Sequence, residues 1–466
     1  MATNTLLITL LALLLFGYFL GRARAIKVAG RTAKGRYDLH SRPQYYGYLV
    51  ALWAGLPALL MLLLWTGFDS SIVTSLTIAD LPSEIQSLSK DEKSLYINQV
   101  KNLAESGTLG AESLAEDAAR HAAAINYQNL MRISTLAKTA AVLSLVVISI
   151  FLALQFIKPK FRARNQVERT IKWIMIACAS VAILTTIGIV FSVLFEALQF
   201  FKAVPIAEFL FGTHWSPQTA IRSDQVGGSG SFGAIPLFTG TLLISAIALV
   251  IAVPLGLMSA IYLSEYASST FRGIAKPMLE ILAGIPTVVY GFFAALTVAP
   301  FIRTLGESIG LHPSSESALA AGIVIGIMII PFISSLSDDV ISAVPQSMRD
   351  GAYAMGATQS ETIKQVIIPA ALPGIVGGVL LAASRAIGET MIVVMAAGLA
   401  ANLTANPLEA VTTVTVQIVT LLTGDQEFDS PKTLAAFALG LGLFTVTLIL
   451  NVISLHVVRK YREQYE

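Results

Sequence analysis

Nine stretches of this sequence are long and apolar enough to cross a lipid bilayer, and this feature constrains the fold most. A membrane-spanning helix needs about 20 apolar residues. Of the 466 residues, 55% are hydrophobic and 13% are charged, whereas soluble domains carry about 25% charged residues. We therefore predict an all-α polytopic membrane protein. The predicted spans are residues 4–21, 46–66, 137–157, 173–198, 237–263, 278–301, 318–342, 371–401 and 433–457.

The basic loops between these spans predict the orientation of the chain. Residues 22–45 hold seven Lys and Arg against one acid, and residues 158–172 hold six against one. Because cytoplasmic loops are enriched in Lys and Arg, both loops and the basic end at 459–462 are expected in the cytoplasm. Nine spans then put the amino terminus outside and the carboxyl terminus inside. The first apolar segment lacks a preceding basic stretch and a cleavage site, so we expect it to be retained.

Residues 67–136 form the longest polar stretch, and they are net acidic, as expected outside the membrane. Apolar residues recur there at spacings of three and four, which predicts helices. Ser113 and Glu116 have the spacing of a capping box. We predict a small helical extracytoplasmic domain, for which packing or docking is favoured over ligand sensing.

Several chemical motifs are absent from the sequence. No GxxxxGK[ST] is present, so no ATP site of that kind is expected. No HExxH, CxxC or cluster of His and Cys indicates a metal, and no cofactor or catalytic set is predicted. Cys178 is the single cysteine, which excludes an internal disulfide. The Gly-rich "VGGSGSFGAIP" (226–236) is interpreted as a flexible loop entering a span.

The stretch "SMRDGAYAMGATQSETIKQVIIPAALPGI" (347–375) predicts a compact cytoplasmic knob of two short helices. Ser347 and Asp350 have the spacing of a helix cap, and Thr358 and Glu361 repeat it. The alternative is an ordinary amphipathic connector lying on the membrane surface.

Two residues are expected to end these helices. Gly356 is suited to the left-handed conformation that closes a helix. Pro369 is expected to end the second helix just before the next span.

The knob resembles the EAA loop of type I ABC importer permeases, E-A-A-x3-G-x9-I-x-L-P. Ala352, Gly356 and Pro369 match that pattern, and Asp350 stands at the position of its glutamate. Gly351, Val366 and Ile368 depart from it mildly. In that family the loop docks onto a separate ATPase subunit. The resemblance implies that Asp350, Ala352, Gly356 and Pro369 belong to an ATPase coupling element, and that this chain is half of a transmembrane pair.

Arg385 and Glu389 are two charges inside the apolar stretch 371–401. On one continuous helix both lie within about 60° of the face that carries Gly374 and Gly378. Small residues let a neighbouring helix approach closely. We therefore expect both charges to face the bundle interior rather than lipid.

Three interpretations of this pair remain open from the residues alone. The two side chains are a structural i,i+4 ion pair, a proton relay of a secondary transporter, or an oxyanion site. In the last, the planar guanidinium suits phosphate geometry and the glutamate keeps the attraction modest.

Further segments resemble the permeases of the high-affinity phosphate importer, of the PstC type. They are "EFLFGTHWSP" (208–217), "LEILAGIPTVVYGFF" (279–293) and "RAIGET" (385–390). The likeness covers about residues 170–460, and the rest resembles the extension of longer members. It implies that Arg385, Glu389 and Thr390 belong to the phosphate pathway.

The other marked residues are less specific. Pro286 is expected to kink its span, and Thr287 and Tyr290 to line a path, although packing also explains Tyr290. Asp338 and Asp339 are expected to brace the knob or pair with Arg349.

A further carboxylate, Glu280, lies near the cytoplasmic end of its span. We expect it to pair with Lys276 at the membrane surface.

The resemblance implies a six-helix permease core preceded by three extra helices. The predicted boundaries are 1–66 with two spans, 67–136 as the outer domain, 137–172 with the third span, 173–236 with the first core span, and 237–458 as the type-1 transmembrane domain with its coupling loop at 347–369. Expected partners are a homologous permease (PstA type), an ATPase dimer (PstB type), an external phosphate-binding protein (PstS type) and membrane lipid, without nucleic acid. The alternatives are a permease for sulfate or molybdate and an ion-coupled carrier.

Overall fold

The computed structural model describes residues 3–29, 39–82, 85, 89–106, 115–219, 229–423 and 430–462. Within these residues nine helices are long and apolar enough to span a membrane. The prediction of an all-α polytopic protein with about nine spans is confirmed. The chain divides into two compact units, Met1–Leu184 and Thr185–Glu466, and each is described by itself.

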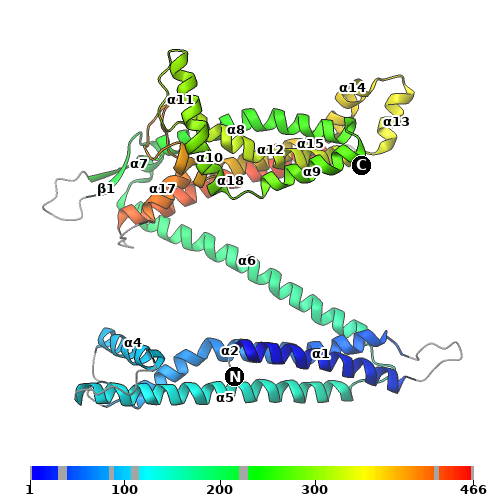
Figure 1. Ribbon diagram of the computed structural model, residues 1–466, viewed down its shortest axis with the longest axis vertical. Coiled ribbons are helices and arrows are strands. Elements are labelled where there is room, and N and C mark those ends of the chain that lie inside the picture. Colours follow the sequence, from blue (N-terminus) through cyan, green and yellow to red (C-terminus); the bar gives the residue numbers. More distant parts are fainter. Residues whose placement is uncertain are drawn as a thin grey trace. The chain divides into compact units, whose positions relative to one another are not determined.

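The first unit is built on three long helices, α1 (Thr3–Val28), α2 (Pro43–Ala79) and α5 (Ala115–Gln155), which lie side by side (Figure 1). Their shared core is apolar and includes side chains of all three helices. Gly47 lets α2 approach α1 closely, because a Cβ there would lie 2.6 Å from the ring of Tyr18.

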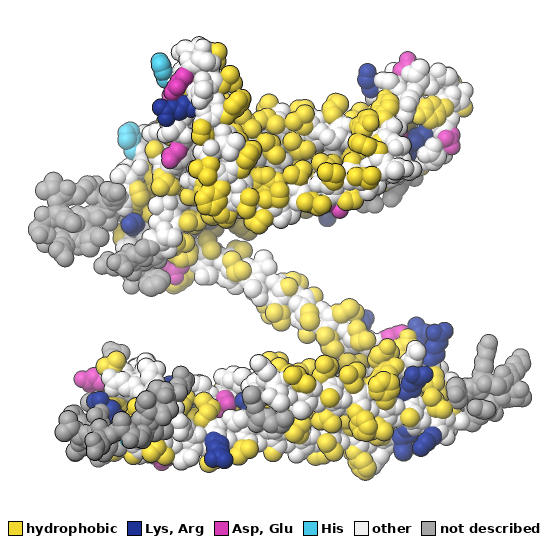
Figure 2. Space-filling view, in the orientation of Figure 1, with side chains coloured by type: hydrophobic (Ala, Val, Ile, Leu, Met, Phe, Trp, Pro, Cys, Tyr) yellow, Lys and Arg dark blue, Asp and Glu magenta, His cyan; other side chains and the backbone are white. Residues whose placement is uncertain are grey.

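The two predicted basic loops meet at one end of this bundle. The backbone N–H of His40 donates to the carbonyl of Pro159 at 3.0 Å, and that of Arg164 donates to Ser41 Oγ at 3.1 Å. Figure 2 shows Lys and Arg side chains gathered at this end. Since the ends of the two loops are bonded to each other, both loops lie on the same side of the membrane.

The described part of the region 67–136 is helical, and two of its helices are continuous with the neighbouring spans. α2 and α5 run through its predicted boundaries without interruption, and α4 (Lys90–Ser106) packs against them. The helices continue because no Pro or Gly interrupts them at residue 136 and Gly67 is tolerated within α2. The predicted cap at Ser113 lies outside the described residues.

The second unit begins within α6 (Ala163–Ala203) and centres on α12 (Ala318–Ser342), the most buried of the nine spans among the described residues. α8 (Ile235–Ile261) packs along α12. A Cβ on Gly322 would lie 2.6 Å from Ile247, so this glycine permits the close contact. A long helix, α18 (Pro431–Arg462), ends the described chain.

An antiparallel hairpin interrupts the helices at one end of this unit. After α7 (Ile206–Phe211), β1 (Trp215–Thr219) pairs with β2 (Ser229–Phe232). The prediction of a loop over 226–236 is therefore wrong for its middle part. Strand pairing orders it, since Trp215 stands opposite Phe232 and their rings pack edge to face at 6.0 Å.

The sixth predicted span is broken near its start. An amphipathic helix, α9 (Ser269–Ala283), ends before Gly284, and α10 (Thr287–Phe293) begins a new helix. Pro286 is the residue before that start rather than a kink within one helix. The span begins at Thr287 and continues through the π-helical turn η2 (Ala294–Val298) and α11 (Ala299–Ser308). Residues 278–283 do not belong to it, because they lie in α9, before the break.

Candidate functional site

The eighth predicted span ends earlier than expected. α15 (Ile368–Ile387) stops at Gly388, and α16 (Met391–Ala396) starts after a break at residues 388–390. The assumption of one helix over 371–401 is wrong because Glu389 and Thr390 leave the helical path.

The break positions Glu389 as a buried cap. Its side chain is 8% exposed, and its Oε1 accepts a hydrogen bond from the N–H of Ile392 at 3.4 Å, at the start of α16. Its backbone carbonyl accepts from Thr415 Oγ1 at 2.9 Å, which ties the break to α17 (Val414–Leu421). A carboxylate is favourable beside the free N–H groups of a helix start. Sequence reasoning missed Thr415, which only this contact identifies.

The predicted small-residue face of α15 is confirmed as a seam against α12. A Cβ on Gly374 would lie 2.4 Å from Val340, and one on Gly378 would lie 3.3 Å from Leu336. Arg385 continues the seam, and its guanidinium carbon lies 5.8 Å from the ring centroid of Phe332. Phe332, Leu336 and Val340 are four residues apart, so they form one ridge of α12.

Arg385 and Glu389 differ in environment. Arg385 is exposed on this chain, whereas Glu389 is buried. Among the ion pairs of the described residues, none joins Arg385 to Glu389, because the break removes Glu389 from the i,i+4 position. Glu389 is buried as expected, whereas Arg385 packs on the α12 seam and stays exposed on this chain, and the structural ion pair is not formed.

Thr390 lies at the same break, half-buried. Its hydroxyl donates to the carbonyl of Gly388 at 3.4 Å. One turn before Gly388, Ser384 Oγ donates to Asn451 Oδ1 of α18 at 3.2 Å. A run of polar groups therefore accompanies Arg385 through an otherwise apolar part of the unit.

Tyr290 has a structural contact of its own. Its ring is buried at 6% exposure, and its hydroxyl donates to the carbonyl of Leu282 at 2.9 Å, joining α10 to the end of α9. Beside it, a Cβ on Gly291 would lie 2.6 Å from Met395 Sδ, so α10 packs tightly against α16. Thr287 is half-buried in the first turn of α10. Tyr290 and Gly291 therefore hold α10 against the end of α9 and against α16.

The predicted knob is present as two short helices, α13 (Gln346–Ala354) and α14 (Gln359–Thr362). Gly356 between them has φ +86°, as expected for a left-handed helix end. Thr358 and Glu361 form the predicted capping box. The predicted cap at Ser347 is wrong, because Pro345 is the N-cap and α13 begins at Gln346, two residues earlier than predicted.

Pro369 does not end the second helix of the knob. The π-helical turn η3 (Ile363–Ile367) joins α14 to α15 without a break, and Pro369 lies in the first turn of α15. A wider turn relieves the clash between a proline ring and the preceding carbonyl. The knob and the span that carries Arg385 are therefore one helical segment, Gln359–Ile387.

The knob is attached to the core through Arg349. Its Nη2 donates to Glu265 Oε1 at 2.9 Å and to the carbonyl of Ile341 at 2.9 Å, and its Nη1 donates to the carbonyl of Val344. Glu265 lies in η1 (Tyr262–Tyr266), the π-helical turn after α8. Arg349 is 9% exposed, so it is a buried anchor.

The expected pairing of Asp338 and Asp339 with Arg349 is therefore wrong. Asp338, at 2% exposure, instead accepts from Arg272 Nη2 at 2.9 Å and from Lys276 Nζ at 2.7 Å. Asp339 accepts from Lys276 at 3.3 Å. Two cations of α9 thus hold the end of α12.

Lys276 is consequently engaged away from Glu280, which is exposed, and the predicted Lys276–Glu280 pair is not formed. α9 lies outside the nine spans. The hydrogen bond to Asp338 raises the pKa of Lys276 above its usual value.

A cavity of about 320 Å³ lies at the hairpin end of this unit. Trp215 Nε1 donates to Gln417 Oε1 at 3.0 Å in its wall, and Gln417 Nε2 donates to the carbonyl of Leu399 at 3.1 Å. Lys432 lines the same cavity. The sequence singled out the tryptophan only by resemblance, and the pairing with Gln417, 202 residues away, had no local signal.

The described part of the chain contains no group of three or more His, Cys, Asp or Glu side chains placed to hold a metal ion.

Two family models match parts of this chain. Residues 7–185 match the family model "Phosphate ATP-binding cassette transporter", and residues 252–463 match "Binding-protein-dependent transport system inner membrane component". The chain is 33% identical over 280 residues to the probable ABC transporter permease protein YqgH of Bacillus subtilis, covering 60% of this chain and 86% of that protein.

Two phosphate permeases are equally similar. The phosphate transport system permease protein PstC of Mesorhizobium japonicum is 33% identical over 267 residues, covering 54% of this chain and 78% of that protein. PstC 1 of Mycobacterium tuberculosis is 34% identical over 278 residues, covering 54% and 81%. The chain belongs to the PstC family of phosphate transport permeases. As a PstC-family member it is a multi-pass component of the inner membrane, and its relatives are the permease subunits of ABC transporters.

Proposed function

We propose that this protein is the permease subunit of an ATP-driven importer that moves inorganic phosphate across the inner membrane. The observation that carries the proposal is the position of Arg385. Its guanidinium is exposed on the glycine seam of α15, at the end of the helical segment that begins in the knob. A planar set of donors suits a tetrahedral oxyanion.

Glu389 and Thr390 complete the proposed phosphate pathway. The buried carboxylate of Glu389 is held by the N–H of Ile392, so it stays near Arg385 without neutralising it in an ion pair. A passing anion is attracted by Arg385 and repelled by Glu389, which keeps binding weak enough for release. Thr390 adds a hydroxyl at the break.

The helical segment Gln359–Ile387 supports a mechanical link between the knob and Arg385. At 1.5 Å per residue, about 39 Å separates Gln359 from Arg385. A movement of the knob is transmitted along that segment because a hydrogen-bonded helix is stiff. Asp350, Ala352, Gly356 and Pro369 belong to this coupling element in our proposal.

The knob also offers a surface to a partner. Met355 is 89% exposed and Tyr353 is 42% exposed on the turn that ends α13. We infer that an ATPase dimer of the PstB type docks here, and that the permease itself performs no covalent chemistry. A homologous permease of the PstA type covers the exposed face of Arg385, and a binding protein of the PstS type delivers phosphate. The amino terminus then lies outside and the carboxyl terminus in the cytoplasm.

The decisive experiment measures phosphate uptake by the complete complex in proteoliposomes with ATP inside. We expect Arg385→Ala to abolish uptake without lowering the amount of complex in the membrane. Arg385→Lys keeps the positive charge but loses the planar set of N–H donors. Its uptake should be lower than that of the wild type but still measurable. Undiminished uptake by Arg385→Ala would show that this arginine is outside the pathway.

Two further measurements separate the alternatives. Competition by sulfate or molybdate equal to that by phosphate would assign another oxyanion. Uptake that persists without ATP but collapses with the proton gradient would indicate an ion-coupled carrier and contradict the proposal.

A further inference from the structure

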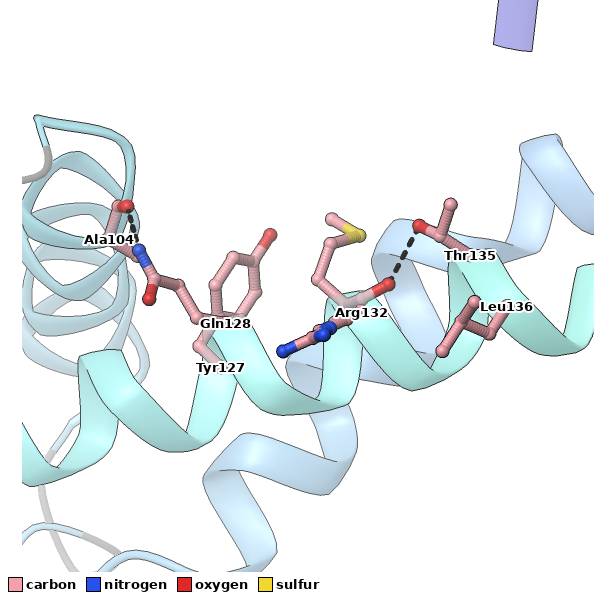
Figure 3. Close-up of a pocket in the computed structure, with 7 residues that line it drawn as sticks. Ala104, Tyr127, Gln128, Arg132, Thr135 and Leu136 are labelled. Atoms are coloured by element: carbon pink, nitrogen blue, oxygen red, sulfur yellow. Dashed lines mark hydrogen bonds between the residues drawn. The ribbon is translucent and has the colours of Figure 1, made fainter. Parts of the chain in front are cut away.

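A groove on the first unit lies where α4 ends against α5 (Figure 3). Its volume is about 520 Å³. The amide of Gln128 donates to the carbonyl of Ala104 at 2.7 Å and so closes one end of the groove between the two helices. The lining residues are Ala104 of α4 and Tyr127, Gln128, Met131, Arg132, Thr135 and Leu136 of α5.

The apolar length of α5 indicates that the groove lies near the level where this helix enters the bilayer. The apolar part of α5 begins at residue 137, and Arg132 precedes it by about 7.5 Å of helix rise. The headgroup layer on each side of a bilayer is about 5–7 Å thick. Trp65 marks the same level, because its Nε1 donates to Ser134 Oγ at 3.0 Å and tryptophan is enriched at membrane interfaces.

Arg132 differs from the other cations around it. Lys138 is buried at 7% side-chain exposure and pairs with Asp69 at 3.6 Å, and Arg120 lies 5.8 Å from the ring centroid of Tyr96. Arg132 is exposed, and no hydrogen bond or ion pair with another described residue uses it. In Figure 3 its guanidinium extends toward Tyr127 within the groove. Among the described residues its five N–H donors therefore have no protein acceptor, and they are open to an anion from the surroundings.

We propose that the groove binds the phosphate-bearing headgroup of one membrane phospholipid, in the leaflet on the side of α4. Arg132 binds the phosphodiester through its fork of N–H groups. Leu136, which is 58% exposed, and Met131 contact the first carbons of the acyl chains. The groove is polar at the end away from the bilayer and apolar at the end that enters it, in the order of a phospholipid.

The apolar wall of the groove favours a lipid over free phosphate. The hydroxyl of Thr135 donates to the carbonyl of Met131 at 2.8 Å, and the amide of Gln128 is engaged by Ala104. A free phosphate ion would contact only the polar end of the groove and gain nothing from the apolar wall. A phospholipid places its phosphate at Arg132 and its first acyl carbons along Met131 and Leu136, so it matches both ends of the groove.

This lipid site is independent of the transport pathway proposed above. It tethers the α4 end of the first unit to the membrane surface. Loss of the lipid leaves Arg385 and its surroundings unchanged.

The test measures retained lipid on the purified complex by native mass spectrometry after titration with phosphatidylglycerol. We expect the wild type to bind one lipid at this site. The affinity of Arg132→Gln for that lipid should be lower by at least about tenfold. Arg120→Gln is the matched control on the same helix and should bind as the wild type does. Equal binding by Arg132→Gln would overturn the proposal.

Two further probes identify the chemistry that is bound. Diacylglycerol has the same tails without phosphate and should not be retained at this site, whereas equal retention would reduce the site to an apolar groove and overturn the proposal. Inorganic phosphate should not displace the lipid, and displacement at millimolar concentration would assign a free-anion site instead. Arg132→Lys, which is less disruptive, should weaken lipid binding, and unchanged binding would contradict recognition by the guanidinium fork.

Discussion

Arg349 in the knob and Glu265 in η1, the turn that follows α8, are joined by a buried ion pair, with Nη2 and Oε1 2.9 Å apart. Their side chains are 10% and 9% exposed. Because Arg349 also binds two carbonyls at the end of α12, a displaced knob must move α8 and α12 with it. This pair therefore connects a movement of the knob to the helices of the core.

The first prediction concerns this connection. Arg349→Met leaves Glu265 buried without a partner, and we expect it to destabilise the protein by about 3 kcal/mol. Thermal unfolding in detergent measures the loss. The double variant Arg349→Met with Glu265→Met should recover part of the stability, since the bonds to the carbonyls of Ile341 and Val344 stay lost, but not ATP-driven uptake. Full uptake by the double variant would show that the pair is not needed for coupling.

A second prediction concerns the charge of Glu389. Glu389→Gln keeps an oxygen that accepts from Ile392 but removes the negative charge from the break. Phosphate should then leave the pathway more slowly, lowering turnover by about tenfold, equivalent to about 1.4 kcal/mol. Uptake rates in proteoliposomes provide the measurement. Unchanged turnover with Gln, and a defect only in Glu389→Ala, would assign the side chain to capping alone.

The third prediction uses two glycines of the knob. Gly356 has φ +86°, so Gly356→Ala should strain the turn by about 1–2 kcal/mol. We expect weaker copurification of the ATPase with this variant. Gly351→Ala is the matched control, because it lies within α13 and a Cβ there meets nothing within 4 Å. It should stabilise the helix slightly and leave copurification unchanged, and an equal loss in both variants would refute a specific role for the turn.

The fourth prediction is a pH dependence at α9. The bond to Asp338 raises the pKa of Lys276 in the folded protein. Its contribution to stability is therefore complete below the unfolded value of about 10.4 and is lost as pH rises through the raised folded value. The difference in melting temperature between the wild type and Lys276→Met should be constant from neutral pH to about pH 10 and shrink above it. A difference that shrinks on acidification toward pH 7 would contradict this assignment.

Local patterns in the sequence predicted much of the fold and part of the candidate site. Apolar length determined the nine spans, and cap spacing determined the Thr358–Glu361 box. The glycine face of α15 followed from helical periodicity alone. These features depend on residues within a few turns of one another, so the sequence is sufficient.

Contacts between distant segments had no such signal. The partners of Arg349 and Asp338 lie 84 and 66 residues away, respectively, and competing nearby charges made the predicted pairings wrong. The break at 388–390 is equally non-local. It is stabilised by Thr415 and by the packing of α10 against α16, both of which override the helical propensity of an apolar run.

The sequence by itself determined that this chain crosses a membrane, how many long apolar spans it has and which short loop resembles a coupling element. Hydrophobic length, charge in loops and capping residues act locally, so they can be interpreted without coordinates. Only the tertiary structure decided that α15 ends between Arg385 and Glu389, which leaves Arg385 exposed and Glu389 buried. Whether a helix continues or breaks inside the bilayer depends on whether other helices supply hydrogen bonds to the freed backbone groups, and here Thr415 supplies one.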